Sequence, residues 1–226
     1  MDTSFAKPVN WHYETLPIET KRALDFLSGQ DWLKESDWYL TKGTALALCV
    51  GNRKSYDLYF FIQSKNFNEK NLLSKFLDNK YWKTDIEERG TIYGELHGAK
   101  ISFIAYPFFK AKYNYIWYNF VKVLNPLDIA VMKITAISQR GKKRDFFDLY
   151  WCANNLESLE DIIKKLPEQY PLIAHDFHHI LKSMVYFEDA ESDPEPEIYF
   201  EADWETVKKF FIKEIPEIMK KVVGLD

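Results

Sequence analysis

Two adjoining segments, residues 38–48 and 52–61, constrain the fold of this chain more than any other part of its sequence. The first predicts a short strand, a turn at Gly43-Thr44 and a helix of small residues. The second predicts an aromatic strand that holds one carboxylate, Asp57. Glycine at such a turn lets backbone N–H groups approach a ligand, and the N-terminus of the following helix favours negative charge. This order therefore indicates an anion-binding turn beside a strand that presents a carboxylate to a metal ion.

Hydrophobic spacing and turn residues divide the chain at about residue 125. Before that point, helices are predicted over residues 16–27, 44–50 and 68–78, and strands just before Gly43 and over 56–62, 82–89, 91–96 and 100–106. After Pro126, helices are predicted over residues 127–139, 143–154, 159–166, 172–187 and 204–222, with a solvated acidic loop at 188–197. The strand over 56–62 is apolar on both faces, which is typical of the centre of a sheet. The chain should therefore form an α/β core to about residue 125, followed by a helical C-terminal region.

Composition excludes several functional classes. The 226 residues carry a formal net charge of −4, which does not provide the overall positive field of a tight nonspecific nucleic-acid binder, although basic residues cluster at 140–144. No apolar run reaches the roughly 18 residues of a membrane span, and the N-terminus lacks the pattern of a signal peptide. Cys49 and Cys152 have no paired spacing. They are predicted to be reduced core residues of an intracellular, cytoplasmic protein without a membrane partner.

Asp57 is the only carboxylate in the aromatic strand, so its charge needs an explanation. In an extended strand it shares one face with Tyr59 and Phe61. One interpretation is a functional carboxylate on the wall of a site. The other is a strand-end aspartate that pairs with Arg53 or Lys54.

Two further charged residues fall in apolar helical surroundings. Lys133 is flanked at four-residue spacing by Ile129 and Ile137, so its ammonium lies on the packed stripe of its helix. It either serves a site or extends along the apolar face to water. Asp148 lies among aromatic residues, four positions after Arg144. It either forms an ordinary ion pair with that arginine on a solvated face or belongs to a site.

Six segments, taken in order, carry a resemblance to a known family. They are Lys-Gly-Thr-Ala-Leu at 42–46, Gly-Asn-Arg-Lys-Ser-Tyr-Asp-Leu-Tyr-Phe-Phe at 51–61, Gly-Ala-Lys-Ile-Ser-Phe at 98–103, Asp-Ile-Ala-Val-Met-Lys at 128–133, Arg-Gly-Lys-Lys-Arg-Asp-Phe-Phe-Asp-Leu-Tyr at 140–150, and Tyr-Phe-Glu-Asp-Ala-Glu at 186–191 with the prolines after it. The chain resembles the AbiEii/AbiGii toxin family of nucleotidyltransferases, in the DNA polymerase β-like superfamily. The resemblance runs almost from end to end.

The resemblance implies a nucleotidyltransferase core over residues 1–125, with a mixed β-sheet flanked by helices. It also implies that residues 126–226 complete an active-site cleft. Asp57 would bind Mg²⁺, Lys133 would neutralise phosphate charge, and Asp148 would complete the catalytic set. The nucleotide-binding residues implied by the resemblance are Lys42, Gly43, Thr44, Arg53, Ser55 and Lys133.

Three positions depart from the family pattern. Lys42 replaces the first of two glycines at the turn, Asn52 replaces a histidine before Arg53, and Tyr59 replaces the second carboxylate of Asp-x-Asp. One carboxylate together with substrate phosphates can hold Mg²⁺, so a weak or single metal site is expected. We hypothesise that the ammonium of Lys42 partly replaces the missing metal charge.

The functional expectation is an enzyme that binds a nucleoside triphosphate with Mg²⁺ and transfers a nucleotidyl group to an acceptor such as the end of an RNA or tRNA. A cognate antitoxin encoded nearby is the protein partner that the resemblance implies. The alternative is a catalytically impaired nucleotidyltransferase-fold module for binding or regulation, because Tyr59 and Lys42 alter the metal site.

Overall fold

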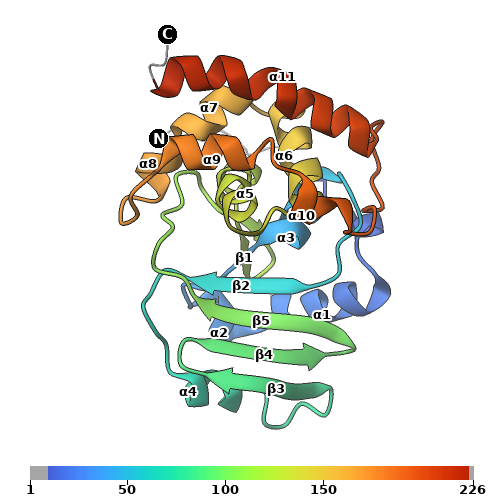
Figure 1. Cartoon of the computed structure of the whole chain (residues 1–226). Helices are drawn as coiled ribbons and strands as arrows, with labels where there is room; N and C mark the ends of the chain where they lie inside the picture. Colours follow the sequence, from blue (N-terminus) through green and yellow to red (C-terminus); the bar gives the residue numbers. More distant parts are fainter. Residues whose placement is uncertain (1–9, 224–226) are drawn as a thin grey trace, which may run out of the picture.

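Seven strands form one mixed sheet in the computed structural model, which describes residues 10–223. The strands follow the order β3-β4-β5-β2-β1-β7-β6; the β1–β7 and β2–β5 pairs are parallel and the others antiparallel (Figure 1). Their bounds are β1 Tyr39–Thr41, β2 Leu58–Ile62, β3 Trp82–Glu88, β4 Thr91–Leu96, β5 Ala99–Ala105, β6 Ile116–Tyr118 and β7 Val121–Val123. The predicted central strand, β2, lies between β5 and β1, as its two apolar faces indicated.

Helices cover both faces of this sheet. Along the chain they are α1 Ile18–Ser28, α2 Asp31–Lys34, α3 Lys42–Val50, α4 Glu69–Ser74, α5 Pro126–Arg140, α6 Lys143–Asn155, α7 Leu159–Lys164, α8 Leu166–Gln169, α9 Phe177–Ser183, α10 Glu188–Glu191 and α11 Trp204–Val223, after a 3-10 turn at Tyr13–Thr15. The helices from α5 onward gather on one side of β2, in the upper half of Figure 1. Helix α3 contacts β1, β2 and α5, so it lies where the sheet meets the helical part.

An aromatic core fills the face of the sheet that is turned away from α5. The rings of Phe60 on β2 and Phe103 on β5 stack with centroids 5.1 Å apart. Trp38, Trp32 and Phe76 pack around Phe103 at centroid distances of 5.2, 6.3 and 6.1 Å. Because side chains alternate along a strand, Tyr59 and Phe61 of β2 point to the opposite face, toward the helices from α5 onward.

Local sequence explains where the elements next to the site begin and end. Helix α3 ends at Gly51, which adopts φ +69°, a left-handed conformation that glycine reaches at little cost. The side chain of Asn125 accepts a hydrogen bond from the Leu127 backbone N–H, and Pro126 starts α5. Gly141 ends α5 at φ +51°, so α6 follows at once and the basic residues 140–144 lie at the junction.

Most predicted elements are confirmed, with specific differences. The prediction of one helix over residues 172–187 is wrong. The side chain of Asp176 accepts a hydrogen bond from the His179 backbone N–H and caps α9, which is Phe177–Ser183. Residues 159–166 divide into α7 and α8, and α4 is shorter than predicted. Strand β2 begins at Leu58, so Asp57 immediately precedes it. Strands β6 and β7 and the short helix α2 were not predicted.

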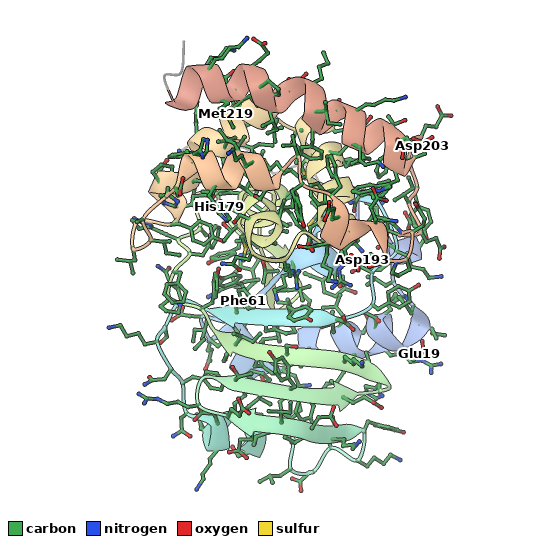
Figure 2. The ribbon with its side chains drawn as sticks, viewed as in Figure 1. Glu19, Phe61, His179, Asp193, Asp203 and Met219 are labelled. Atoms are coloured by element: carbon green, nitrogen blue, oxygen red, sulfur yellow. The ribbon has the colours of Figure 1, made fainter. Side chains whose placement is uncertain are left out.

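The acidic segment after α9 is largely exposed, as predicted, but it begins with the short helix α10 and is held to other parts of the chain. We define residues 188–199 as the acidic strap. Its carboxylates bind the basic cluster, with Asp193 3.0 Å from Lys142 and Glu195 3.6 Å from Lys143. Ile198 forms a β-bridge with Arg53 and fastens the strap to the loop before β2. Figure 2 shows Asp193 between α10 and the sheet, on the side where this loop lies.

Two other expectations concern features outside the sheet. Among residues 10–223, no helix combines the length and apolarity that crossing a bilayer demands. Cys49 and Cys152 are both unpaired cysteines, and Cys152 is fully buried. The residues used for the signal-peptide prediction lie outside the described residues.

Candidate active site

A cavity of about 220 Å³ lies between α3 and β2 on one side and α5 and α6 on the other. Of the predicted site residues, only Asp148 is absent from its wall. The predicted residues on the wall are Lys42, Gly43, Thr44, Arg53, Ser55, Asp57 and Lys133. Phe61, labelled in Figure 2, contributes to the same wall from β2. Segments far apart in the sequence therefore meet at one pocket.

The turn at the start of α3 has an unusual backbone. Lys42 adopts φ +62°, a left-handed conformation that is costly for a residue with a side chain. A Cβ added to Gly43 would lie 2.3 Å from the terminal Nη2 of Arg53, so the guanidinium packs directly on the glycine backbone. Both positions of the turn therefore favour glycine, residue 42 because of its left-handed backbone and residue 43 because of the Arg53 contact. Lys42 is the exception.

Thr44 joins this turn to the carboxylate-bearing loop. Its hydroxyl donates to the backbone carbonyl of Asp57 at 2.5 Å and lies 2.8 Å from the hydroxyl of Ser55. The loop is therefore held against the N-terminus of α3. The half-buried side chain of Asp57 forms no ion pair within residues 10–223.

The alternative partners of Asp57 are engaged elsewhere. Arg53 binds Asp148, and Lys54 lies 3.2 Å from Glu197 of the acidic strap. The interpretation of Asp57 as the partner of Arg53 or Lys54 is therefore wrong. Its carboxylate is left on the cavity wall, available to a ligand.

Four charged side chains form a buried network behind the pocket. Lys133 Nζ lies 2.6 Å from Asp145 Oδ1 and 2.6 Å from Asp148 Oδ2. Arg53 donates from Nε and Nη2 to the two oxygens of Asp148, each at 2.8 Å. Asn52 is the third residue that contacts Asp148, and its side-chain amide donates to Oδ1 at 2.7 Å. Neither the extension of Lys133 to water nor the pairing of Asp148 with Arg144 occurs in this structure.

Asp148 is completely buried and lies behind the wall that Lys133 and Arg53 present. Burial acts to raise the pKa of Asp148, but the charges of Arg53 and Lys133 and their hydrogen bonds lower it to about 2. The pKa of Asp145 is also lowered, because Lys133 and Arg140 outweigh its burial. Asp148 therefore contacts two residues of the cavity wall, Lys133 and Arg53, and is not itself on that wall.

Cations dominate the end of the pocket formed by the α5–α6 junction. Arg140 and Arg144 line it beside Lys133, and Arg140 lies 3.1 Å from Asp145. In the described part of the chain, neither Lys42 nor Arg144 forms an ion pair with a carboxylate. This end of the pocket is therefore suited to an anion such as a phosphate chain.

Asp145, Arg140 and Arg144 were not among the predicted site residues. The sequence contained a signal for all three residues. Asp145 lies three residues before Asp148, so the two share a helix face, and both arginines belong to the basic cluster. Helix periodicity alone could not show that this cluster bends around Gly141 into the pocket.

Lys42 lies over the ring of the residue that replaces the second carboxylate. Its Nζ is 3.9 Å from the ring centroid of Tyr59 and 5.1 Å from that of Phe61, both cation–π distances. Burial, together with the nearby charges of Arg140 and Lys133, lowers the pKa of Lys42 to about 8. The two departures from the family pattern are therefore in direct contact.

The binding of a metal-free triphosphate should weaken as the pH rises through 8, because Lys42 then loses its charge. Each pH unit above 8 should lower affinity about tenfold until the contribution of that charge, on the order of 1–3 kcal/mol, is exhausted. The stability effect has the opposite sign. The pKa of Lys42 is lower in the folded chain than in the unfolded chain. The free energy of unfolding should therefore rise as the pH increases from 8 to the ordinary lysine pKa of 10.5.

Calorimetry with inorganic tripolyphosphate and a chelator, from pH 7.5 to 9.5, measures this dependence. Lys42→Gly is the matched control, because glycine tolerates φ +62° and carries no charge. Equal pH profiles for the variant and the wild type would show that Lys42 does not contact the phosphates.

The residues that could hold a metal ion are few. No cluster of three or more His, Cys, Asp or Glu side chains with metal-site geometry occurs among residues 10–223. Within the described part of the chain, Asp57 is the carboxylate on the wall without a cationic partner, whereas Asp145 is bound to Lys133 and Arg140. The residues therefore fit one Mg²⁺ ion held by a single carboxylate together with substrate phosphates.

Comparisons with known proteins agree with the family that the sequence indicated. The family model "Nucleotidyl transferase AbiEii toxin, Type IV TA system" matches residues 100–221. An uncharacterized protein of Aquifex aeolicus (strain VF5) is 35% identical over 196 residues, which cover 82% of this chain and 89% of that protein.

Two solved structures are similar over most of the chain. One is a protein of H. pylori assigned as a nucleotidyltransferase, with a TM-score of 0.49, 17% identity and coverage of 91% of this chain and 98% of that one. The other is MenT4, a nucleotidyltransferase toxin of Mycobacterium tuberculosis H37Rv, with a TM-score of 0.48, 14% identity and coverage of 89% and 86%. The match to the family model and the match to the A. aeolicus protein show that the chain belongs to the AbiEii family of nucleotidyl transferase toxins.

Proposed function

We propose that the pocket binds a nucleoside triphosphate with Mg²⁺ and that the protein transfers a nucleotidyl group to the end of an RNA. One observation carries the proposal. The Gly43-Thr44 turn, the unpaired carboxylate of Asp57 and the cations of the α5–α6 junction line the same cavity. Backbone N–H groups at a helix N-terminus and surrounding cations are the groups that bind a phosphate chain.

Each side chain then has a defined task. Because residue 43 has no Cβ, the Arg53 guanidinium packs against its backbone, and the backbone N–H groups of the Gly43-Thr44 turn would bind the phosphates beside that guanidinium. Lys133, Arg140 and Arg144 neutralise the charge that develops on the phosphates during transfer. Asp57 would hold Mg²⁺, which when bound shields the phosphates from the attacking oxygen. Residues 126–226 complete the cleft by providing the three cations.

The buried network keeps these groups in place. Asp148 fixes Lys133 and Arg53, and Arg53 in turn packs on the backbone of Gly43. In phosphoryl-group chemistry, positioning and electrostatic stabilisation supply most of the catalysis, so a rigid wall of this kind is useful.

Incubation with labelled nucleoside triphosphates, total cellular RNA and Mg²⁺ tests the proposal. Label should enter RNA with the wild type and be lost in Asp57→Asn. This variant is preferred to Lys133→Ala because the Asp57 carboxylate has no ion-pair partner among the described residues, whereas Lys133 is buried between two carboxylates. If no triphosphate binds by calorimetry and Asp57→Asn behaves as the wild type does, the pocket is not a nucleotide site.

The contact between Lys42 and Tyr59 favours a second candidate, a nucleotide-binding module with impaired catalysis. Tyr59 occupies the position of a metal-binding carboxylate, and Lys42 covers its ring. This candidate predicts triphosphate binding without labelled RNA. Mg²⁺-dependent label that disappears in Asp57→Asn would contradict it.

The family description includes a type IV toxin–antitoxin system, so we also propose a cognate antitoxin as the protein partner. The unpaired cysteines, Cys49 and Cys152, support a reducing compartment, and we place the activity in the cytoplasm. Co-purification with the product of the neighbouring gene tests the partnership.

A further inference from the structure

The pocket changes character along its length. Asp57, just before β2, is followed along one wall by Tyr59 and Phe61 of the strand, so this wall changes from a carboxylate to an apolar ring. Helix α5 presents Ile129 and Met132 in its first half, Lys133 at its middle and Arg140 at its last residue. At 1.5 Å per residue, the helix carries this change over about 16 Å, and the strand carries it over about 13 Å.

Aromatic rings close the end away from Arg140 and Arg144, and the Lys42 ammonium lies 5.1 Å from the centroid of one of them, Phe61. Phe61 and Tyr106 have ring centroids 4.8 Å apart, and Tyr106 and Tyr170 have centroids 6.5 Å apart in an edge-to-face arrangement. All three rings line the cavity, and Thr135 of α5 adds a hydroxyl to its wall. Tyr106 is half-buried, so part of its ring is open to the cavity, whereas Tyr170 is almost completely buried.

The location of these rings is fixed by the chain around them. The Tyr106 backbone N–H donates to the carbonyl of Ile62 at 2.8 Å, so Tyr106 extends the wall of β2 beyond its last residue. The side chain of Gln169, next to Tyr170, donates to Asp128 in the first turn of α5. The aromatic end therefore coincides with the beginning of α5, and the cationic end with its last turn.

We propose that this aromatic end, formed by Phe61, Tyr106 and Tyr170, is a nucleobase subsite. The inference rests on the proposed function, because it takes the cationic end as the phosphate site. Every base presents a flat π face, so stacking on aromatic side chains binds bases with little dependence on their identity. The hydroxyls of Thr135 and Tyr106 are hydrogen-bonded to the buried hydroxyl of Tyr170, and each can make a further bond with the edge of the base.

Two kinds of ligand test the two ends of the pocket separately. Inorganic tripolyphosphate carries the phosphate chain without a base, whereas ATP, GTP, CTP and UTP carry both. Calorimetry at fixed Mg²⁺ should give at least one nucleoside triphosphate a higher affinity than tripolyphosphate. Tyr106→Leu should weaken that nucleotide by about 5- to 100-fold, the range expected for one stacked base, and leave tripolyphosphate unchanged.

Two variants serve as controls. Tyr106→Phe keeps the ring and should keep most of the affinity, with an altered order of preference among the four nucleotides. Tyr93→Leu removes a tyrosine that is exposed on β4 outside the pocket and should change neither ligand. Circular dichroism and thermal unfolding identify any variant that fails to fold, in which case Tyr106→Phe and the wild-type comparison still decide.

The failures of the two proposals are distinguishable. Equal affinity of the wild type for tripolyphosphate and for all four nucleotides would overturn the nucleobase subsite and leave the phosphate site intact. Loss of tripolyphosphate affinity in a folded Tyr106→Leu would also overturn it, because the ring would then serve the phosphates. Absence of binding by every ligand would overturn the proposed function and the subsite together.

Discussion

Asp148→Asn should lower the free energy of unfolding by about 3–5 kcal/mol, the usual cost of removing one partner from a buried ion pair. The carboxylate is fully buried and receives bonds from Arg53, Lys133 and Asn52. Its neutral replacement leaves Arg53 without its carboxylate partner and removes one of the two carboxylates that balance Lys133. Urea unfolding followed by circular dichroism measures the change.

The control is an exposed carboxylate in an ordinary ion pair. Glu217 on α11 lies 3.0 Å from Lys220 at the surface, and Glu217→Gln should change stability far less. The pH dependence provides a second check. The pKa of Asp148 is lowered to about 2 from an ordinary 3.8, so its contribution is present above about pH 4 and is lost as the pH falls toward 2. A variant as stable as the wild type at pH 7 would show that the network does not hold the fold.

Tyr59→Asp should raise Mg²⁺ affinity by about 10- to 100-fold and strengthen transferase activity, because it restores a second carboxylate on the face of β2 that carries Asp57. The structure adds a complication, since the Lys42 ammonium lies over the ring at residue 59 and would pair with the introduced carboxylate. The double variant Lys42→Gly/Tyr59→Asp removes that competitor. Glycine also relieves the left-handed backbone at residue 42. The double variant should therefore gain more than Tyr59→Asp alone.

Calorimetric titration of Mg²⁺ in the presence of a non-hydrolysable triphosphate, together with the RNA-labelling assay, measures both effects. Tyr93→Asp introduces the same charge on β4 outside the pocket and should leave metal affinity unchanged. If the folded Tyr59→Asp and the double variant alter neither metal affinity nor activity, residue 59 does not serve the metal site.

Strand alternation correctly predicted one wall of the pocket. Asp57, Tyr59 and Phe61 share a face in an extended chain, and all three line the cavity even though β2 itself begins at Leu58. Gly43 and Thr44 also line the cavity, although α3 begins at Lys42 and therefore includes both residues in its first turn instead of following them. The family assignment rested on ordered segments and is confirmed, whereas the roles of the site residues stay predictions.

The partners of buried charges could not be predicted from local spacing. From local spacing, Lys133 could extend along the apolar face to water, and Asp148 could pair with Arg144 four residues before it. The actual partners come from other elements, with Arg53 reaching Asp148 from the loop before β2. Helix patterns describe one face of one helix and contain no information about which charge faces it across a core.

Weak or misleading local signals explain the remaining differences. Strands β6 and β7 have three residues each, too few for a period of two to be recognised. In the segment 172–187, apolar residues are spaced as in a helix, but Asp176 caps the backbone and delays the start of α9. The acidic strap is largely exposed, as predicted, but its contacts with Lys142 and Lys143 were not predicted, because these lysines are distant in sequence.

The fastening of the acidic strap has a consequence for the order of events during synthesis. Arg53 must be in place for the pocket to form, and its loop is held by the bridge to Ile198 and by a hydrogen bond from the Tyr199 N–H to the Asn52 carbonyl. These contacts join the first quarter of the chain to its last fifth. A nascent chain that still lacks Ile198 and Tyr199 cannot form these contacts, so we infer that the loop before β2 is fastened late in synthesis.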